Sequence, residues 1–148
     1  MTASHLRPQF VELIPAQLAE GVLYISTQYK TAVHLCPCGC GNRSVTPISP
    51  AQWALKWDGA EVSLWPSVGN WGFPCKSHYV IRDGRVHWAS RWTEAQIERG
   101  AQRDRADRQS YYRAVRRPAE PDASGWRRHL PGFLRTAARA IRSHPDDS

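Results

Sequence analysis

The sequence predicts a mainly β domain built from hairpins, followed by a basic, helical C-terminal extension. Two Asp-Gly pairs flanked by alternating residues indicate two hairpins. All four cysteines lie in Gly/Pro-rich turns, within "HLCPCGCGNR" and "GFPCKSHYV". The composition changes near Trp92: residues 1–90 carry seven Lys/Arg and five Asp/Glu, whereas residues 91–148 carry thirteen and eight. We therefore expect a β domain over residues 1–92 and an arginine-rich extension over residues 93–148.

Three strands are predicted in the first half of the domain. The stretches "GVLYIST" and "TAVHLC" are rich in β-branched and aromatic residues, and the polar "QYK" separates them. "RSVTPI" follows the cysteine-rich turn and is predicted to be the strand that returns from it. Residues 1–20 are mixed in composition, and we expect them to pack locally before Gly21.

The stretch "WALKWDGAEVSLW" predicts a hairpin with a two-residue turn at its Asp-Gly pair. In that register Leu55 faces Val62 on an apolar face. Lys56 faces Glu61 on the other side, where the two form a cross-strand ion pair.

The stretch "HYVIRDGRVHW" predicts a second hairpin, in which Tyr79 faces Trp88 and Ile81 faces Val86. His78 lies at the mouth of this hairpin, where its ring can point toward the cysteine that precedes it by three residues. Between the hairpins, "PSVGNWGFP" contains two prolines and two glycines and is predicted to be a shaped loop.

The extension is predicted to begin with a helix at Thr93, because Gln96 completes a capping box with it. Residues 94–115 are heavily charged and Gly100 weakens their middle, so we expect a solvated or loosely docked helix. A linker follows near residues 118–125. Beyond it, a second helix has an apolar face formed by Leu130, Phe133, Leu134, Ala137, Ala138 and Ile141.

The clustered cysteines predict a metal site. Zinc takes about four ligands in a tetrahedral shell, commonly Cys thiolates with an imidazole. A Cys-x-Cys-x-Cys turn and a Cys-x-x-His turn supply five candidates, one more than four places require. The spacing leaves open whether Cys36 or Cys40 completes the set with the other three, so Zn2+ is expected without a fixed choice of ligands. The candidate ligands are Cys36, Cys38, Cys40, Cys75 and His78.

Three other interpretations of the cysteines compete with a zinc-stabilised domain. Free cysteines are often buried as small apolar residues, but this does not explain their placement in turns. A Rieske centre needs a His where Cys38 stands. A thiolate nucleophile at Cys36 or Cys40, with His87 as its base, lacks any local Cys–His–Asp signature.

The predicted compartment is the cytoplasm. The sequence shows no secretory signal pattern and no apolar stretch of about 18 residues. In a reducing cytosol, closely spaced cysteines bind metal more often than they form structural disulfides.

The motifs "CPCGCG", "SLWPSVGNW" and "PCKSHY" together resemble a bacterial family of unknown function, numbered 6527 among such domains. The resemblance covers residues 10–89 approximately. It implies a small metal-binding protein whose shared site positions are the five candidate ligands. Some members of that family are encoded beside ubiquitin-like proteins, their activating and conjugating enzymes, and a deubiquitinase-like protease. The resemblance implies no established activity, and it does not extend to the arginine-rich tail.

The favoured function is therefore a non-catalytic zinc adaptor in a bacterial ubiquitin-like protein-modification or defence system. Its protein partner would bind the loop between the hairpins, with Trp71 as an anchor. The alternative is a nucleic-acid-binding protein that uses the basic extension, since the pI is about 9.7. An enzyme ranks third, because the sequence shows no paired acids, phosphate loop or nucleophile elbow.

Overall fold

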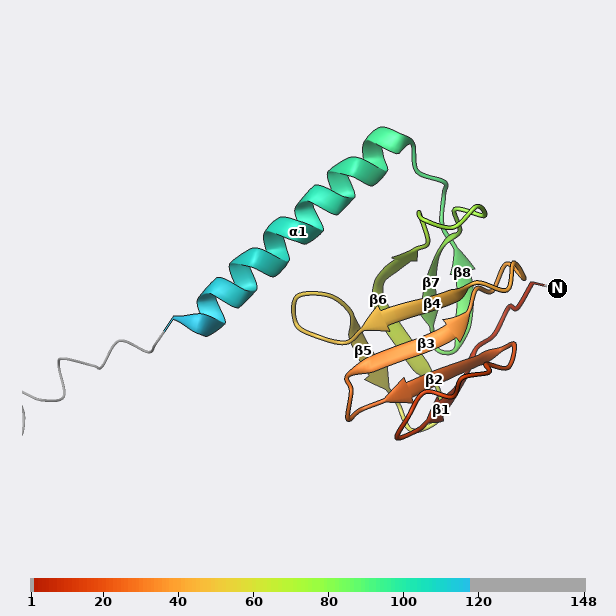
Figure 1. The fold of residues 1–148 in the computed structure, drawn as a ribbon. Helices are drawn as coiled ribbons and strands as arrows, with labels where there is room; N and C mark the ends of the chain where they lie inside the picture. The colour runs from red at the N-terminus through yellow and green to blue at the C-terminus, as the bar shows by residue number, and fades with distance from the viewer. Residues whose placement is uncertain (1, 118–148) are drawn as a thin grey trace, which may run out of the picture. The chain divides into compact units, whose positions relative to one another are not determined.

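The computed structural model describes residues 2–117, and the compact unit considered below ends at Ala114. It contains two four-stranded sheets and one long helix (Figure 1), so the mainly β prediction is confirmed. The predicted linker near 118–125 and the helix from Leu130 lie outside the described residues. The elements are β1 (Arg7–Phe10), β2 (Val22–Ser26), β3 (Thr31–Leu35), β4 (Arg43–Pro47), β5 (Ala54–Trp57), β6 (Val62–Gly69), β7 (His78–Arg82), β8 (Arg85–Trp88) and α1 (Glu94–Arg116).

The first sheet has the order β1-β2-β3-β4. Strands β2, β3 and β4 are the three strands that the sequence predicts, and they pair as an antiparallel meander. Strand β1 was not predicted. It pairs in parallel with β2, from Arg7 beside Val22 to Phe10 beside Ile25. A parallel neighbour has no tight turn and therefore leaves no hairpin signal in the sequence.

The second sheet has the order β5-β6-β7-β8. The predicted register of the β7–β8 hairpin is confirmed, with Tyr79 beside Trp88 and Ile81 beside Val86. Its turn residues, Asp83 with φ 47° and Gly84 with φ 70°, have the positive φ angles that a tight hairpin turn requires.

The predicted register of the β5–β6 hairpin is wrong by two residues. Leu55 pairs with Leu64, and Lys56 pairs with Ser63 instead of Glu61. The Asp58 carboxylate accepts hydrogen bonds from the N–H groups of Ala60 and Glu61, at 2.9 and 2.8 Å. This side-chain cap widens the turn to four residues. A shift of two residues keeps every side chain on its predicted face, so the apolar face survives the error.

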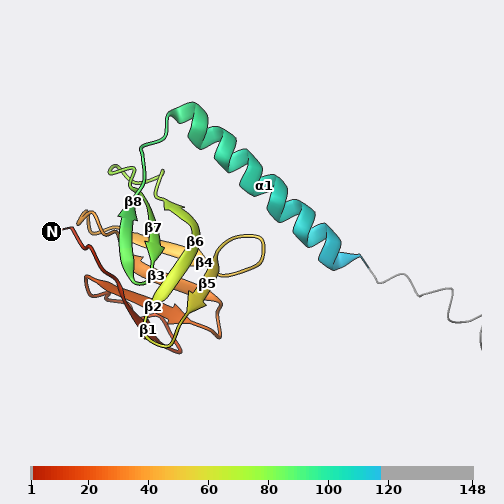
Figure 2. The same ribbon diagram turned by 180° about the vertical axis from the view of Figure 1, so that it is seen from behind.

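The two sheets face each other (Figures 1 and 2). The apolar side chains of both sheets form one core. Leu6, which precedes β1, joins the sheets, because its N–H donates to the carbonyl of Gly84 at 2.8 Å. The buried core comprises Leu6, Leu23, Ile25, Ala32, Val62, Leu64, Val68, Tyr79 and Ile81.

Strand β6 contains a bulge where the sequence predicts only a loop. Leu64 pairs with Ile81 and Val68 pairs with Tyr79, so four steps along β6 (64 to 68) match two steps along β7 (81 to 79). The Trp65–Pro66 peptide bond within the bulge is cis. Bulges redirect side chains out of the regular alternation of a strand. Leu64 before the bulge and Val68 after it both lie in the buried core, so the extra residues of β6 lie between two core positions.

Helix α1 begins as predicted at a Thr93–Gln96 capping box, in which the Thr93 N–H donates to the Gln96 side chain at 2.8 Å. Gly100 is the one buried residue of this helix, and it lies against the ring of Trp92. Its role is close packing, which the sequence did not indicate. Within residues 2–117, no helix combines the length and apolar character needed to cross a membrane.

Candidate functional site

The four cysteines converge at one point although Cys75 lies thirty-five residues after Cys40. All four Sγ atoms lie within 4.8 Å of one another. The distances are 3.3 Å from Cys36 to Cys38, 3.9 Å from Cys36 to Cys75 and 3.6 Å from Cys40 to Cys75. Glycines in the turn, at φ 84° and 76°, let three sulfurs of one short segment face the same point. This cysteine cluster could hold a metal ion.

The protonation of the cysteine cluster differs from sulfur to sulfur. Burial and hydrogen bonding with Cys36 raise the pKa of Cys38 to about 12. At Cys40 burial acts to raise the pKa, but hydrogen bonds from the backbone and side chain of Asn42, together with those from Cys38 and Cys75, lower the pKa to about 6. The outer edge of the cluster thus favours a thiolate, and metal ligation requires thiolates.

A buried polar network connects the cysteine cluster to the core. The Asn70 side chain donates to Ser77 Oγ at 2.9 Å and accepts from Ser44 Oγ at 3.0 Å. Ser77 Oγ lies 3.1 Å from Cys36 Sγ. A hydroxyl in that place donates to a thiolate, so the network supplies the outer hydrogen bond that metal ligands in proteins usually have.

The inner end of the network is His34, whose Nε2 lies 2.7 Å from the Tyr79 hydroxyl. Burial lowers the pKa of His34 from 6.5 to about 4, so its ring is neutral at pH 7. Its Nδ1 has no partner among the described residues. The neutral His34 ring is therefore a structural hydrogen-bond partner of Tyr79 in the core, on the strand that the sequence predicts.

The structure does not bring His78 into the cysteine cluster. The group of neighbouring ligand atoms contains the four cysteines and no histidine. Instead, His78 Nε2 lies 2.9 Å from Ser67 Oγ, and His78 Nδ1 lies 2.9 Å from the carbonyl oxygen of Ser90. A carbonyl only accepts, so Nδ1 carries the proton and Nε2 is the acceptor for the Ser67 hydroxyl. This arrangement pairs a serine with an oriented base, the relationship that activates a serine nucleophile.

Strand register explains how Ser67 and His78 meet. Gly69 pairs with His78 on β7, and Ser67 precedes Gly69 by two residues on the same strand. Adjacent paired residues and residues two apart share one face of a sheet. Ser67 and His78 therefore lie on the outer face, opposite the core side chains Val68 and Tyr79.

Two indoles cover the His78 ring. The ring centroids of Trp71 and Trp92 each lie 5.0 Å from the His78 centroid, and the two indoles stack 5.3 Å apart with planes inclined by 19°. Only 7% of the His78 surface is exposed. Trp71 packs so closely on β6 that a Cβ at Gly69 would lie 2.4 Å from its Nε1.

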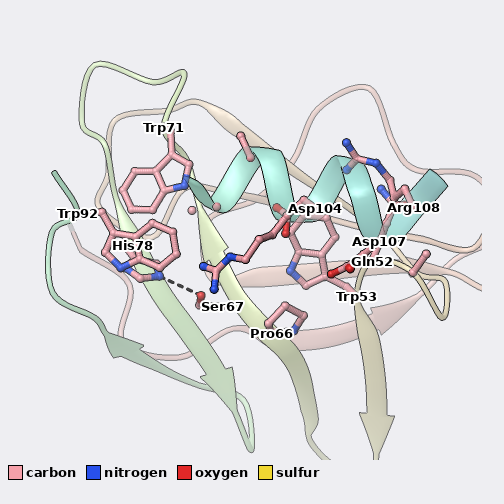
Figure 3. Close-up of a pocket in the computed structure, with 15 residues that line it drawn as sticks. Gln52, Trp53, Pro66, Ser67, Trp71, His78, Trp92, Asp104, Asp107 and Arg108 are labelled. Carbon is pink, nitrogen blue, oxygen red and sulfur yellow. Dashed lines mark hydrogen bonds between the residues drawn. The ribbon is translucent and has the colours of Figure 1, made fainter. Parts of the chain in front are cut away.

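A cavity of about 390 Å³ opens beside Ser67 and His78 (Figure 3). Its other walls come from the segment before β5 and from α1, so it has aromatic, amide and charged sides. This size is within the range of binding pockets for small ligands or peptide segments. The lining includes Gln52, Trp53, Ser67, Gly69, Trp71, His78, Trp92, Arg103, Asp104, Asp107 and Arg108.

The cavity lies where β5 would continue if it were longer. Strand β5 starts at Ala54, beside Trp65, and Trp53 instead bridges to Ile48 near the end of β4. Among the described pairings, the part of β6 from Pro66 to Gly69 has a neighbour on the β7 side alone. The edge of β6 that carries Ser67 is thus open toward the cavity.

Sequence reasoning missed Ser67 entirely. The stretch "WPSVGNW" that contains Ser67 has no nucleophile motif. Because this stretch was predicted to be a loop, its pairing with β7 was not expected. One signal was available in the sequence. The predicted strand that begins at His78 needs a neighbouring strand, and the segment that ends at Gly69 and contains Ser67 could have been assigned to it. His87, the base considered in the competing cysteine-nucleophile interpretation, is an exposed residue on β8.

Comparison with known proteins identifies one family. The sequence model of a family described as "Bacterial ubiquitination-like system serine protease (BubE)" matches residues 10–89. These residues include all four cysteines, Ser67 and His78, and they end before Ser90, Trp92 and α1. No significant match is found among curated proteins or among solved structures.

Proposed function

The chain belongs to this BubE family of bacterial ubiquitination-like systems, and we propose that it is a serine peptidase with Ser67 as nucleophile and His78 as base. The observation that carries the proposal is the hydrogen bond of 2.9 Å between Ser67 Oγ and His78 Nε2 at the wall of a cavity. The family description supports it, because a serine protease requires a serine with such a base.

In the first half of the reaction, Ser67 Oγ attacks the carbonyl carbon of the substrate and its proton passes to His78 Nε2. The tetrahedral intermediate then collapses. The C–N bond breaks, the leaving amine takes the proton from Nε2, and the acyl group stays on Ser67. Throughout, the Ser90 carbonyl holds Nδ1–H and keeps the ring in the productive tautomer, the orienting role that an aspartate has in other serine proteases.

In the second half, water enters, gives a proton to His78 Nε2 and attacks the acyl carbon. The acid product leaves as the proton returns to Ser67 Oγ, so the enzyme ends unchanged. The oxyanion of each intermediate needs N–H donors. The N–H of Ser67 lies in the bulge, outside the regular pairing of β6 with β7, and is the donor that we expect to face it.

We infer that the substrate is an extended polypeptide segment. Asn70 donates its N–H to the Ser77 carbonyl on the β7 side, so the backbone groups of Gly69 face the opposite, open side. A peptide lying there would take the place of the missing continuation of β5. Pairing with a free strand edge is a common way to hold an extended peptide. The protein that contains this segment is proposed to belong to the ubiquitination-like system.

We propose that the cysteine cluster holds a structural zinc ion. A tetrahedral zinc with Zn–S bonds of about 2.3 Å has sulfurs about 3.8 Å apart, and the three distances of 3.3, 3.9 and 3.6 Å fit that spacing. Four sulfur ligands fill the shell and leave no place for a reacting water. When bound, zinc would fix the loops that precede β4 and β7, and His78 would remain free to act as a base.

The test is a fluorophosphonate probe, which forms an adduct only with an activated serine. The full chain with its native metal would be incubated with the probe, and peptide mass spectrometry would locate the adduct. We expect an adduct at Ser67 in the wild type and none in Ser67→Ala or His78→Ala. Ser63→Ala is the matched control: Ser63 lies on the same strand, but its hydroxyl bonds to Asp83.

Two results would contradict the peptidase. One is a wild-type protein without an adduct, and the other is an adduct that persists in Ser67→Ala. The first would favour the non-catalytic adaptor, whose test is capture of a protein of the ubiquitination-like system by the Ser67→Ala variant. Nucleic-acid binding has weaker support, because α1 carries four acidic residues beside its six arginines, and these offset most of its positive charge.

A further inference from the structure

The partner that orients His78 is a backbone carbonyl in an irregular segment. Ser90 lies between the end of β8 and the start of α1, and its side chain is exposed. An aspartate in a catalytic triad is fixed by its own hydrogen bonds and by burial. The Ser90 carbonyl keeps its direction only if residues 89–93 are held in place.

Both ends of this segment are held. At one end the Ala89 N–H donates to the carbonyl of His78 at 2.9 Å. At the other end Trp92 inserts beside His78 and stacks on Trp71. Thr93 then caps α1 directly after it.

Helix α1 holds Trp92 in this place. Gly100 lies so close to Trp92 that a Cβ on it would come within 2.8 Å of the ring atom Cζ3. Glu94, in the first turn of the helix, pairs with Lys76, which follows Cys75 in the loop before β7. The helix is thus attached to the site at two points about 1.7 turns apart.

We propose that Trp92, held by α1, is a positioning residue that fixes the Ser90 carbonyl and the ring of His78. The helix, which lies outside the residues matched by the family, is then part of the catalytic site. The inference rests on the proposed peptidase activity but makes a separate claim. A peptidase that used only residues 10–89 would place Ser67 and His78 without Trp92.

The first experiment measures the rate of Ser67 labelling by the fluorophosphonate in the full chain. Trp92→Ala removes the indole, Trp92→Phe keeps an aromatic ring, and Gly100→Leu pushes the helix from Trp92. Trp57→Ala is the matched control, since Trp57 is 53% exposed and contacts Phe10. Each variant is first checked for its fold by circular dichroism and for its bound metal.

We expect Trp92→Ala and Gly100→Leu to lower the maximal labelling rate at least about tenfold, because misplacement of a base by about 1 Å can cost a hundredfold in rate. Trp92→Phe is expected to restore most of the rate, and Trp57→Ala to leave it unchanged. Folded Trp92→Ala and Gly100→Leu variants that label at the wild-type rate would overturn the proposal. If Trp92→Ala does not fold, Trp92→Phe and Gly100→Leu make the same comparison.

The second experiment follows the proton on His78 Nδ1 by NMR and does not depend on catalysis. A proton held between Nδ1 and the Ser90 carbonyl exchanges slowly and gives a low-field signal, assigned by its loss in His78→Gln. We expect the signal in the wild type and its loss in Trp92→Ala. Its persistence in Trp92→Ala would overturn the positioning role. A wild type that shows the signal but no adduct at Ser67 would sink the peptidase and leave the positioning of His78 by Trp92 supported.

Discussion

Ser67 Oγ and His78 Nε2 lie 2.9 Å apart on neighbouring strands, eleven residues apart in the chain. Since His78 Nδ1 is committed to the Ser90 carbonyl, the free ring nitrogen has the serine hydroxyl as its partner. A general base in such a position typically contributes 10²–10⁴-fold to a rate. The pair is therefore the first target for substitution.

We predict that His78→Ala slows acylation of Ser67 by a fluorophosphonate roughly a thousandfold. The variant leaves a space between Ser67 and the two indoles, which added imidazole can enter. If the lost function is that of a base, imidazole should restore part of the rate in proportion to its concentration. The measurement is the rate of adduct formation with and without imidazole. A rate in His78→Ala equal to the wild-type rate would remove His78 from the reaction.

If the cysteine cluster and the Ser67–His78 pair are separate sites, substitutions in them should affect zinc content and acylation in opposite ways. Cys75→Ser removes one of four sulfurs and should reduce bound zinc to well below one ion per chain, with a lower melting temperature. His78→Ala should keep the zinc and lose the acylation. Native mass spectrometry and elemental analysis measure the metal in both variants. Loss of zinc in His78→Ala would return His78 to the ligand set that the sequence also permits.

The hydroxyl of Ser77 predicts a smaller effect on the same zinc. It lies 3.1 Å from Cys36 Sγ inside the buried network, away from bulk solvent. We expect Ser77→Ala to weaken zinc binding about 10–100-fold, the usual cost of losing a partner of a metal ligand. Competition with a chromogenic chelator measures the affinity.

Asn42→Ala is the comparison for that prediction. Asn42 donates to Cys40 Sγ at 3.2 Å on the exposed side, where water can take over the hydrogen bond. Its effect on zinc affinity should be several-fold smaller than that of Ser77→Ala. Equal effects would mean that the buried network does not support the metal ligands.

The sequence predicted those parts of the fold that local chemistry determines. The β7–β8 register follows from an Asp-Gly turn and alternating residues, and the α1 start follows from its capping box. The Asp58 turn shows the limit of such reasoning, because the same Asp-Gly pair accommodates a two-residue or a four-residue turn. Strand β1 depends on a partner strand fifteen residues away, which no local pattern records.

The candidate site divides in the same way. The convergence of the four cysteines could be predicted, because their close spacing and the glycines between them already indicate a turn that gathers sulfurs. The place of Ser67 could not, because its hydrogen bond to His78 depends on the bulge in β6 and the pairing of that strand with β7. The assignment of His78 to the metal illustrates the difference. Three residues separate it from Cys75 in the chain, but the alternation of β7 turns its ring to the outer face.

Gly69 gives the last prediction, because it lies between Ser67 and Trp71. A Cβ on Gly69 would lie 2.4 and 2.5 Å from Nε1 and Cε2 of the Trp71 indole, so Gly69→Ala must displace that ring. Overpacking of this kind costs about 1–3 kcal/mol of unfolding free energy. The displaced indole should also loosen its stack on Trp92 and slow acylation of Ser67.

Gly72→Ala is the matched control, since it adds the same methyl group three residues later, just beyond β6, with no atom within 4 Å of it. Urea unfolding measures the stability of both variants, and the fluorophosphonate rate measures the site. We expect Gly69→Ala to lower both the unfolding free energy and the rate of fluorophosphonate labelling. Gly72→Ala should change neither quantity by more than about 0.5 kcal/mol or its equivalent in rate. Equal behaviour of the two variants would show that the packing of Trp71 on β6 supports neither the fold nor the serine.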